Sequence, residues 1–542
     1  MTSPLPGVSG LYRKAEQRLS RLINSGQADL LAGGRIGLEK ESLRVTPEGN
    51  LSQRPHPEAL GSPLTHPSIT TDYSEALAEF ITPPLDDAAQ ALAALRDTQR
   101  FVYDVLERDG AGELLWATSM PCVVAGETSI PIAQYGPSNA GTMKTVYRRG
   151  LGLRYGRVMQ VIAGVHFNYS FSDDFWGLYQ QLEGERGDRQ AFVAAAYFGL
   201  IRNLQRFGWL VPYLFGASPA VCKSFLGGKS TPLESFDAVT YYQPFATSLR
   251  MGDIGYQNNR EAKVGVKANY DDVDAYVASL LAAITTPYEE YRKLGVVVDG
   301  QYQQLNANIL QIENEYYSTI RPKQIVDDFE MPAHALKRRG VQYVELRSID
   351  VNAFDPLGID EEQLHFLEAF LVFCLLHDSP PIGAEERDHI DHNELASAHR
   401  GRDPRLYLHR GDEKLRLTQW AGELLDAMTG VCELLDTGHD DVPYSASLAA
   451  QQDKVRDPER TPSARMLAGM REAGEGFFHF AMRKSQQHQA YFQGLRLTTA
   501  HREQFERLAK RSWQRQRDME AADHESFADY LQRYLSQAHR AP

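Results

Sequence analysis

The sequence predicts an α+β fold, in which a largely antiparallel sheet is followed by a mainly helical C-terminal third. Short strand-like runs lie between loops and helices from about residue 35 to 355, and they are not spaced as regular βα units. After Pro356 the apolar residues change to helical spacing. We therefore expect an α+β sheet core with an N-terminal helix over residues 1–355 and a helical region over 356–542, packed on the core or forming one domain with it.

The elements follow in order along the chain. Residues 11–32 form a helix with one apolar stripe. The strand-like runs are 34–45, 163–171, 304–315 and 341–350. Further helices are expected near 364–375 and over 412–437 and 461–538, with a polar loop at 437–460 between the last two. Thr461 or Ser463 is expected to cap the helix that begins there.

Composition and charge narrow the function classes. The net charge of −14 is unfavourable for general nucleic-acid binding, which uses basic patches. Neither a signal peptide nor a stretch long enough to span a membrane is evident, so we expect a soluble, cytoplasmic protein. The four cysteines are far apart and form no CxxC motif, so we expect four reduced thiols: Cys122, Cys222, Cys374 and Cys432.

Several familiar nucleotide-binding and catalytic motifs are absent from the sequence. The segment GGKS at 227–230 ends like a phosphate-binding loop, but Lys223 stands where that loop requires glycine. GLGLRYG at 150–156 has the wrong spacing for a dinucleotide fingerprint, and neither HExxH nor GxSxG occurs. If the protein uses ATP, it does not hold it with a standard P-loop.

Acidic residues recur on the faces of the strand-like runs. Glu39 and Glu41 are two residues apart, so on a strand both carboxylates point the same way. Two carboxylates this close repel each other unless a proton or cation lies between them, and Mg²⁺ prefers oxygen ligands. The alternative is the solvated face of an amphipathic strand.

Two further runs have the same two-sided character. In 163–171 one face is apolar and the other carries His166 among small polar groups; this His is either structural or a metal ligand. In 341–350, Glu345 and Arg347 share a face, either as a cross-strand ion pair or as a metal ligand beside a phosphate clamp. Several acid-bearing strands backed by apolar residues describe a carboxylate-lined cup that suits a metal–nucleotide site.

Two acidic segments are less clear. Asp72, Glu75 and Glu79 share one face if 69–82 is helical, whereas Glu79 alternates with Phe80 if the segment ends as a strand. Periodicity does not decide between these. The run at 311–323 adds a cluster of polar and basic side chains next to an apolar stretch: Glu313, Asn314, Arg321 and Lys323.

Taken together, the ordered segments resemble the glutamate–cysteine ligases, or γ-glutamylcysteine synthetases, of γ-proteobacteria. Among the matching segments are GLEKESLRV (37–45), ITTDYSEALAEFITP (69–83), QYGPSNAGTMKTVYRRGL (134–151), FATSLRMGDIGY (245–256), LQIENEYYSTIRPK (310–323) and YVELRSIDVNAFDPLGID (343–360). They run in order from near residue 35 to near residue 531. The resemblance implies a curved antiparallel sheet funnel like the glutamine synthetase core.

The resemblance also implies roles for individual residues. The expected metal ligands are Glu39, Glu41, Asp72, Glu79, His166 and Glu345. Arg250 and Arg347 correspond to the catalytic arginines near the transferred phosphate and the acyl group. The cysteine pocket is expected from Tyr73, Tyr147, Leu151, Gln160, Tyr256 and Tyr317. The nucleotide is expected near Asn314, Arg321 and Lys323. Lys40 replaces the arginine that is frequent in the family, and Tyr73 stands where an aromatic without a hydroxyl is common.

By this resemblance the substrates are ATP, L-glutamate and L-cysteine, and the cofactor is Mg²⁺, as two or three ions, with Mn²⁺ as a substitute. The reaction joins the γ-carboxylate of glutamate to the cysteine amine through a γ-glutamyl phosphate, the first step of glutathione synthesis. Glutathione is expected to inhibit, and the enzyme is expected to be a monomer. The alternatives are a ligase for another amine, a guanidino-kinase type of phosphotransferase, and a metal-binding protein without turnover.

Overall fold

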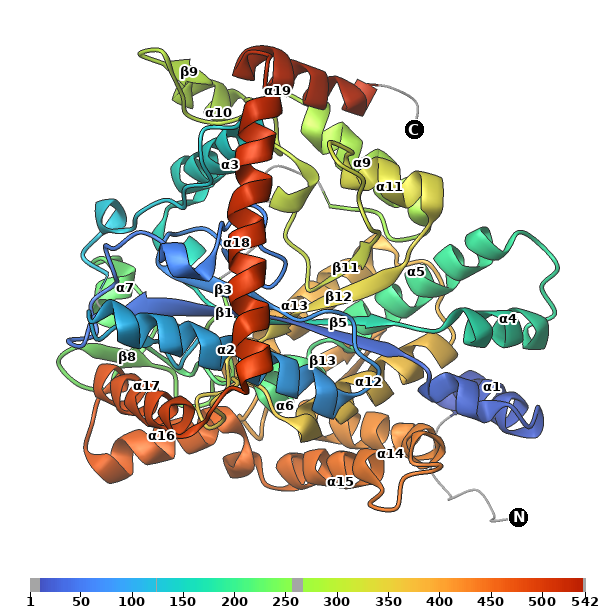
Figure 1. Cartoon of the computed structure of the whole chain (residues 1–542). Helices are drawn as coiled ribbons and strands as arrows, with labels where there is room; N and C mark the ends of the chain where they lie inside the picture. The colour runs from blue at the N-terminus through green and yellow to red at the C-terminus, as the bar shows by residue number, and fades with distance from the viewer. Residues whose placement is uncertain (1–9, 123, 256–266, 540–542) are drawn as a thin grey trace.

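A computed structural model describes residues 10–122, 124–255 and 267–539 (Figure 1). A twisted sheet crosses the middle of the molecule, with helices on both sides of it. In this part of the chain the main sheet has seven strands, all paired antiparallel. They are β1 (Arg35–Val45), β2 (Ile69–Thr71), β3 (Leu77–Ile81), β4 (Leu114–Leu115), β5 (Val165–Ser170), β11 (Ile320–Lys323) and β12 (Tyr343–Ile349). The predicted α+β fold with an antiparallel sheet is confirmed.

The strand order across the sheet is β11-β12-β5-β1-β3-β2, and β4 pairs with the end of β1. The small sheets pair β6 (Ala220–Cys222) with β8 (Thr240–Tyr242) and β7 (Glu234–Ser235), β9 (Val297–Val298) with β10 (Gln301–Tyr302), and β13 (Tyr407–Arg410) with β14 (Glu413–Arg416). The segment 69–81 is therefore a hairpin of β2 and β3, which decides the open question between helix and strand.

The helices of the first part of the chain are α1 (Arg13–Asn24), α2 (Ala88–Asp109), α3 (Asn139–Tyr155), α4 (Asp173–Leu182), α5 (Arg189–Phe207), α6 (Leu210–Phe215), α7 (Lys223–Leu226), α9 (Val273–Thr285), α10 (Glu289–Leu294) and α11 (Pro332–Arg339). Several begin at a side chain that accepts a hydrogen bond from the first turn. Asp87 caps α2 in this way and Ser138 caps α3. Such caps satisfy backbone N–H groups that the helix leaves unpaired.

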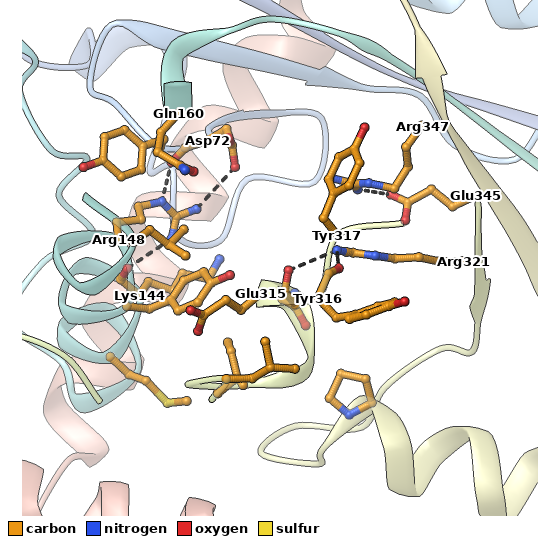
Figure 2. Close-up of a pocket in the computed structure, with 18 of the residues that line it drawn as sticks. Asp72, Lys144, Arg148, Gln160, Glu315, Tyr316, Tyr317, Arg321, Glu345 and Arg347 are labelled. Carbon is orange, nitrogen blue, oxygen red and sulfur yellow. Dashed lines mark hydrogen bonds and ion pairs between the residues drawn. The ribbon is translucent and has the colours of Figure 1, made fainter. Parts of the chain in front are cut away.

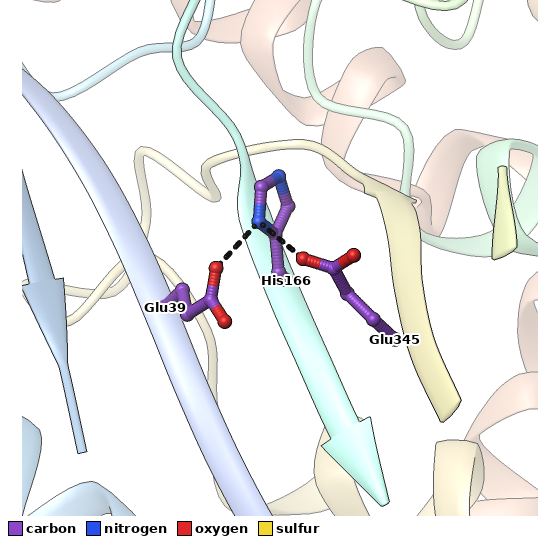
Figure 3. Close-up of side chains that lie close together, drawn as sticks. All are labelled: Glu39, His166 and Glu345. Carbon is purple, nitrogen blue, oxygen red and sulfur yellow. Dashed lines mark hydrogen bonds and ion pairs between the residues drawn. The ribbon is translucent and has the colours of Figure 1, made fainter. Parts of the chain in front are cut away.

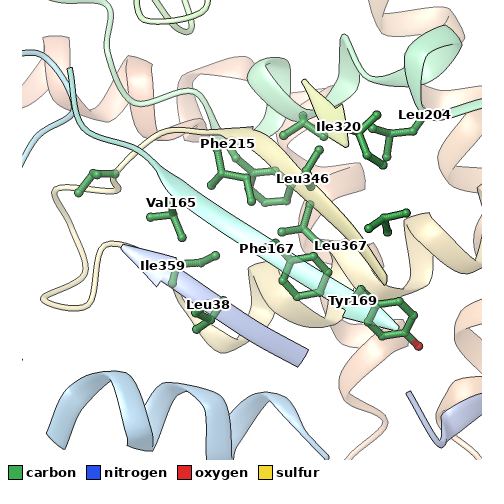
Figure 4. Packing of buried hydrophobic residues seen from close by; sticks show 14 of the residues in the cluster. Leu38, Val165, Phe167, Tyr169, Leu204, Phe215, Ile320, Leu346, Ile359 and Leu367 are labelled. Atoms are coloured by element: carbon green, nitrogen blue, oxygen red, sulfur yellow. The ribbon is translucent and has the colours of Figure 1, made fainter. Parts of the chain in front are cut away.

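One face of the central strands is apolar and packs on helices (Figure 4). Leu38, Phe167 and Leu346 lie on this face of β1, β5 and β12, and each is fully buried. They pack against residues of α5 and of α12 (Glu361–Leu376), including Leu204 and Leu367. Because side chains alternate along a strand, the opposite face is left to the polar residues of the same strands.

The C-terminal third is helical, as predicted: α12, α13 (Ala384–Arg400), α14 (Leu417–Leu435), α15 (Pro443–Arg456), α16 (Pro462–Ala473), α17 (Phe477–Gly494), α18 (Thr499–Ala522) and α19 (Phe527–Leu535). Thr461 caps α16 by accepting the N–H of Ala464, which confirms one of the two predicted caps. None of the helices in the described ranges is long and apolar enough to cross a lipid bilayer.

Two element predictions are wrong, and the helix predicted over 412–437 begins only at Leu417, because Glu413–Arg416 is strand β14. The expected loop at 437–460 contains α15, which begins at Pro443. The expected strand at 304–315 is an irregular segment that ends in a short 3-10 helix, Glu313–Glu315. In that segment side chains replace a strand partner, since the Asn306 amide donates to the carbonyl of Gln311 and Glu315 accepts the N–H of Gln311. Local bonds of this kind compete with a sheet ladder.

The expectation of four reduced thiols is also wrong. Cys122 and Cys222 form a disulfide with their Cα atoms 5.5 Å apart, although 100 residues separate them in the sequence. Such a pairing has no local sequence signature, because only the tertiary fold brings the two cysteines together. Cys374 and Cys432 are free and buried, as expected of reduced thiols.

Candidate active site

The polar face of the sheet forms the floor of a cavity of about 980 Å³. Its lining combines strands β1, β3, β5, β11 and β12 with α3 and with the segment 309–317. Figure 2 shows Asp72 and Arg148 on one side of this cavity and Glu345 and Arg347 on the other, with Tyr317 between them. A cavity of this size accommodates ligands as large as a nucleotide with small co-substrates.

Three metal-binding groups converge on the floor (Figure 3). Glu39, His166 and Glu345 come from the adjacent strands β1, β5 and β12, and one ligand atom of each lies within 4.8 Å of the others. His166 Nδ1 is 3.0 Å from Glu39 Oε2 and 3.5 Å from Glu345 Oε1. The strand register produces this arrangement, because Glu39 pairs with His166 and Glu345 pairs with Asn168.

A second group of acids lies next to these three. Glu41 pairs directly with Glu79 across β1 and β3, and Asp72 lies in the turn of the β2–β3 hairpin. Burial and the charge of Asp72 raise the pKa of Glu41 to about 8. Burial and the charges of Glu39 and Asp72 raise the pKa of Glu79 well above its usual range. These shifts mean that the five carboxylates cannot all be ionised together unless a cation lies among them.

The three converging groups carry different charges. Burial opposes ionisation of Glu345, but Lys323 and Arg347 outweigh it and hold the pKa of Glu345 well below its usual range. Burial and the nearby Arg347 lower the pKa of His166, which favours the neutral imidazole that binds metals. The donor set therefore fits divalent cations: carboxylates dominate it, one neutral imidazole joins them, and Asn168 Oδ1 is buried without a hydrogen-bond partner among the described residues.

Basic side chains flank the acids on the β11–β12 side. Arg347 Nη1 donates to Glu345 Oε1 at 3.0 Å, and Lys323 Nζ lies 3.2 Å from Glu345 Oε2. Arg321 pairs with Glu345 across the two strands and also lines the cavity. These three cations surround one carboxylate, so they present excess positive charge to any anionic ligand beside the metal-binding groups.

Arg250 occupies a different position from the other predicted arginine. It is 3% exposed, donates from Nη2 to the carbonyl of Arg347 at 2.9 Å, and lies 3.6 Å from Asp350. The described residues that line the cavity do not include it. Gly164 makes room for the Arg250 guanidinium, because a Cβ at that position would lie 2.1 Å from Arg250 Nη2. The same Gly164 donates its N–H to Glu41 Oε2.

Most residues expected around the cysteine substrate lie on one wall. Tyr147 and Leu151 share a face of α3, and Tyr73, Gln160 and Tyr317 also line the cavity. The Tyr73 hydroxyl reaches α3 at Gly152, where a Cβ would lie 2.2 Å from it. It has no hydrogen-bond partner within the described part of the chain. Tyr256 lies outside the described residues. Asn314, expected near the nucleotide, is among the cavity-lining residues.

The sequence reasoning missed three polar residues of the site. Lys144 and Arg148 line the cavity from α3, and Asn168 Nδ2 donates to Glu39 Oε1 at 3.0 Å. The sequence contains a pattern that could have identified each of these residues. Lys144 and Arg148 are four residues apart and share a helix face with Tyr147 and Leu151. Asn168 alternates with His166 on the polar face of β5.

Comparisons with known proteins agree with this site. The family model for glutamate–cysteine ligase matches residues 19–396. A glutamate–cysteine ligase of Alcanivorax borkumensis is 47% identical over 96% of this chain and 99% of its own length. The chain belongs to the glutamate–cysteine ligase family. A relative from Pseudomonas paraeruginosa with the same name is 48% identical over 96% of this chain and 97% of its own. The resemblance to γ-proteobacterial members of the family is confirmed.

Solved structures support the same family fold. The crystal structure of a glutamate–cysteine ligase from Francisella tularensis in complex with AMP has a TM-score of 0.87 and 36% identity, and the match covers 94% of this chain and 98% of that chain. A bifunctional glutathione synthetase from Pasteurella multocida has a TM-score of 0.64 at 24% identity, covering 87% of this chain and 53% of that chain. The second likeness shows a shared fold only.

Proposed function

We propose that this chain joins the γ-carboxylate of L-glutamate to the amine of L-cysteine at the expense of ATP, the first step of glutathione synthesis. One observation carries the proposal: a chain that belongs to the ligase family places Glu39, His166 and Glu345 together beside Arg347 on the floor of a large cavity. The products are γ-glutamylcysteine, ADP and phosphate. The AMP bound to the Francisella relative supports the use of an adenine nucleotide.

The proposed metal-binding residues are Glu39, Glu41, Asp72, Glu79, His166 and Glu345, for two or three Mg²⁺ ions with Mn²⁺ as a substitute. Bound to these groups, the ions supply positive charge to the phosphates of ATP. Asn168 holds Glu39 in place through its amide, and Gly164 holds Glu41 through its backbone N–H. These contacts fix the carboxylates before any ligand binds.

A carboxylate is a poor acyl donor, because its leaving group would be oxide. Transfer of the γ-phosphoryl group of ATP to the γ-carboxylate of glutamate gives an acyl phosphate, which the cysteine amine attacks with release of phosphate. In this reaction the chain supplies positioning and charge rather than a covalent bond. Arg347 binds the transferring phosphoryl group, since its guanidinium faces the cavity and Glu345 fixes its orientation.

Arg250 supports this step through its contact with the backbone of Arg347. Its bond to the carbonyl of Arg347 positions the strand that carries Arg347, and it neutralises part of the charge around Glu41. Asn314, Arg321 and Lys323 bind the nucleotide from the β11 side. Tyr73, Tyr147, Leu151, Gln160, Tyr256 and Tyr317 form the cysteine pocket. An acyl phosphate is hydrolysed by water, so the rings of Tyr73, Tyr147 and Tyr317 that line the cavity also serve to keep water from it.

We also propose an inhibitor, an oligomeric state and a cellular location for the enzyme. Glutathione inhibits the enzyme, because it contains the γ-glutamylcysteine unit that the cavity makes. A monomer is the working unit, because one chain supplies every proposed metal-binding residue to the same cavity. The reaction takes place in the cytoplasm, where ATP is available.

An ADP-release assay in which each substrate is omitted in turn tests the proposal, together with mass spectrometry of the product. We expect ADP release that requires both glutamate and cysteine, and a product with a new amide bond. A stable phosphorylated product would instead identify a phosphotransferase, and ADP release with another amine would identify a different ligase. Glu41→Gln and Arg347→Ala should abolish turnover, and activity within about tenfold of the wild type in either variant would overturn those roles.

A further inference from the structure

One side of the cavity is aromatic and is not used by the roles proposed above. Phe329, Tyr530 and Tyr534 line it, together with the ring of Pro332 and the side chain of Ile312. Phe329 packs edge-on against Tyr530 and Tyr534, with ring centroids 5.0 and 5.5 Å apart. The Arg533 guanidinium covers the Phe329 ring at 3.8 Å. The two tyrosines come from α19, just over 200 residues beyond Phe329 in the sequence.

Helix α19 joins two walls of the cavity. In the segment just before it, Asp523 and the carbonyl of Glu525 accept hydrogen bonds from Asn139, the first residue of α3. In the 3-10 turn just after it, Gln537 accepts the N–H of Met331 and donates to the carbonyl of Phe329. Figure 1 shows the long α18 crossing the molecule and delivering α19 to the side where α3, α9 and α11 lie. The C-terminal segment therefore closes the cavity between α3 and the loop 324–331.

The aromatic wall, formed by Phe329, Tyr530 and Tyr534, includes a residue that closely follows the basic strand β11 in the sequence. Strand β11 carries Arg321 and Lys323, which belong to the basic cluster around Glu345. The loop that bears Phe329 follows directly after this strand. Arg321, Lys323 and the aromatic wall line the same cavity, so one ligand can contact both with different parts of its structure. A nucleotide has this division, with phosphates at one end and a flat base at the other.

We propose that the aromatic wall of Phe329, Tyr530 and Tyr534 receives the purine base of the nucleotide, so that the C-terminal helix α19 is part of the nucleotide site. Aromatic side chains bind bases by stacking and by burying apolar surface. This inference rests on the proposed use of ATP, and it adds residues from the far C-terminus to that site. It also gives α18 a role, which is to carry α19 across the molecule.

The test compares AMP with ribose 5-phosphate, which has the same phosphate and sugar but no base. Calorimetry with the full-length wild type should show a clear preference for AMP. In Tyr530→Ala the ratio of the two affinities should fall at least about tenfold, within the range that stacking of one base on one aromatic ring supports. Tyr530→Phe keeps the ring and should keep the ratio. Tyr491→Ala, which removes an exposed tyrosine from α17, should also keep it.

Hydrogen exchange of the wild type provides a second measurement that needs no variant. AMP should slow exchange of the backbone amides over 527–535, whereas ribose 5-phosphate should not. Equal affinities for the two ligands in the wild type, an unchanged ratio in Tyr530→Ala, or exchange over 527–535 that AMP leaves unaltered would overturn the inference. If the wild type ligates glutamate and cysteine while one of these results is found, the proposed function stands and only the base site fails. A wild type without ligase activity contradicts the proposed function itself.

Discussion

Adjacent residues of β1 meet opposite environments. Glu39 faces the polar cavity, whereas Lys40 points to the other face and is only 3% exposed. The Lys40 ammonium donates to the Gln99 side chain at 2.6 Å. Burial lowers the pKa of Lys40 to about 7, and the nearby Asp355 offsets this only in part. Because side chains alternate along β1, placing Glu39 in the cavity places Lys40 in the core. Burying this ammonium costs free energy of folding.

This burial predicts a pH dependence of stability. The pKa of Lys40 is lower in the folded than in the unfolded chain, so the unfolded chain binds more protons between pH 7 and about 10. The contribution of Lys40 to the free energy of unfolding should therefore rise with pH in that interval, by up to about 1.4 kcal/mol per unit. In urea denaturation, Lys40→Met should gain most over the wild type at pH 7 and least at pH 9.

An exposed lysine of α18 provides the control. Lys510→Met should follow the wild-type dependence of unfolding free energy on pH, because Lys510 is exposed in both states. If the free energy of unfolding changed with pH in the same way in the wild type and in Lys40→Met, the Lys40 ammonium would not lose its proton on folding.

The buried acids of the site predict that the stability of the protein depends on bound metal. Burial and Asp72 raise the pKa of Glu41 to about 8, so without metal its contribution to stability is present at low pH and is lost as the pH rises through 8. In EDTA, Glu41→Gln should therefore become more stable relative to the wild type between pH 6 and 9. Saturating Mg²⁺ should raise the melting temperature of the wild type more than that of Glu41→Gln. Glu48→Gln, an exposed change, should behave as the wild type, and an equal Mg²⁺ effect in all three proteins would argue against Glu41 as a ligand.

At the scale of elements, the turn into β5 controls the position of Arg250. A Cβ on Gly164 would lie 2.1 Å from Arg250 Nη2, so Gly164→Ala must displace the guanidinium or the strand. We expect kcat/KM to fall about a hundredfold, the scale on which misplacement of a site by an ångström acts. Steady-state kinetics with circular dichroism as a check of folding would measure this.

Gly422→Ala is the matched control for this change. Gly422 lies within α14 with open space around the position of a Cβ. Alanine is the better helix former by about 1 kcal/mol, so this variant should keep full activity and gain stability. Full activity in Gly164→Ala would mean that the reaction does not depend on where Arg250 lies.

The elements also show which parts of the structure the sequence can predict. The strands β1, β5 and β12 were readable because each alternates between an apolar and a polar face. Helix α15 was missed because it buries only a narrow stripe, which includes the polar side chains of Ser447 and Gln451. The segment 304–315 was mistaken for a strand because its apolar residues resemble one, whereas its amides and Glu315 bind the backbone locally.

At the scale of the whole molecule, the floor of the site was predictable and its walls were not. Alternation along three strands places the acids on one face, and the strand order then brings Glu39, His166 and Glu345 together. The part played by Tyr530 and Tyr534 depends on how α18 crosses the molecule, which no local pattern encodes. The same holds for the disulfide, because Cys122 and Cys222 approach each other only in the folded chain.

The length of the loop that the disulfide closes predicts how much this bond adds to the free energy of unfolding. Cys122 follows Ser119, which accepts hydrogen bonds from Ala163 and Val351 next to β5 and β12, while Cys222 ends β6. Closing a loop of this length restricts the unfolded chain, and the chain-entropy model gives about 4.7 kcal/mol for a loop of roughly 100 residues. In guanidinium denaturation, dithiothreitol should therefore destabilise the wild type by up to that amount. The double variant Cys122→Ala/Cys222→Ala should show the reduced stability with or without dithiothreitol. Insensitivity of the wild type to dithiothreitol would mean that the bond adds nothing to the free energy of unfolding.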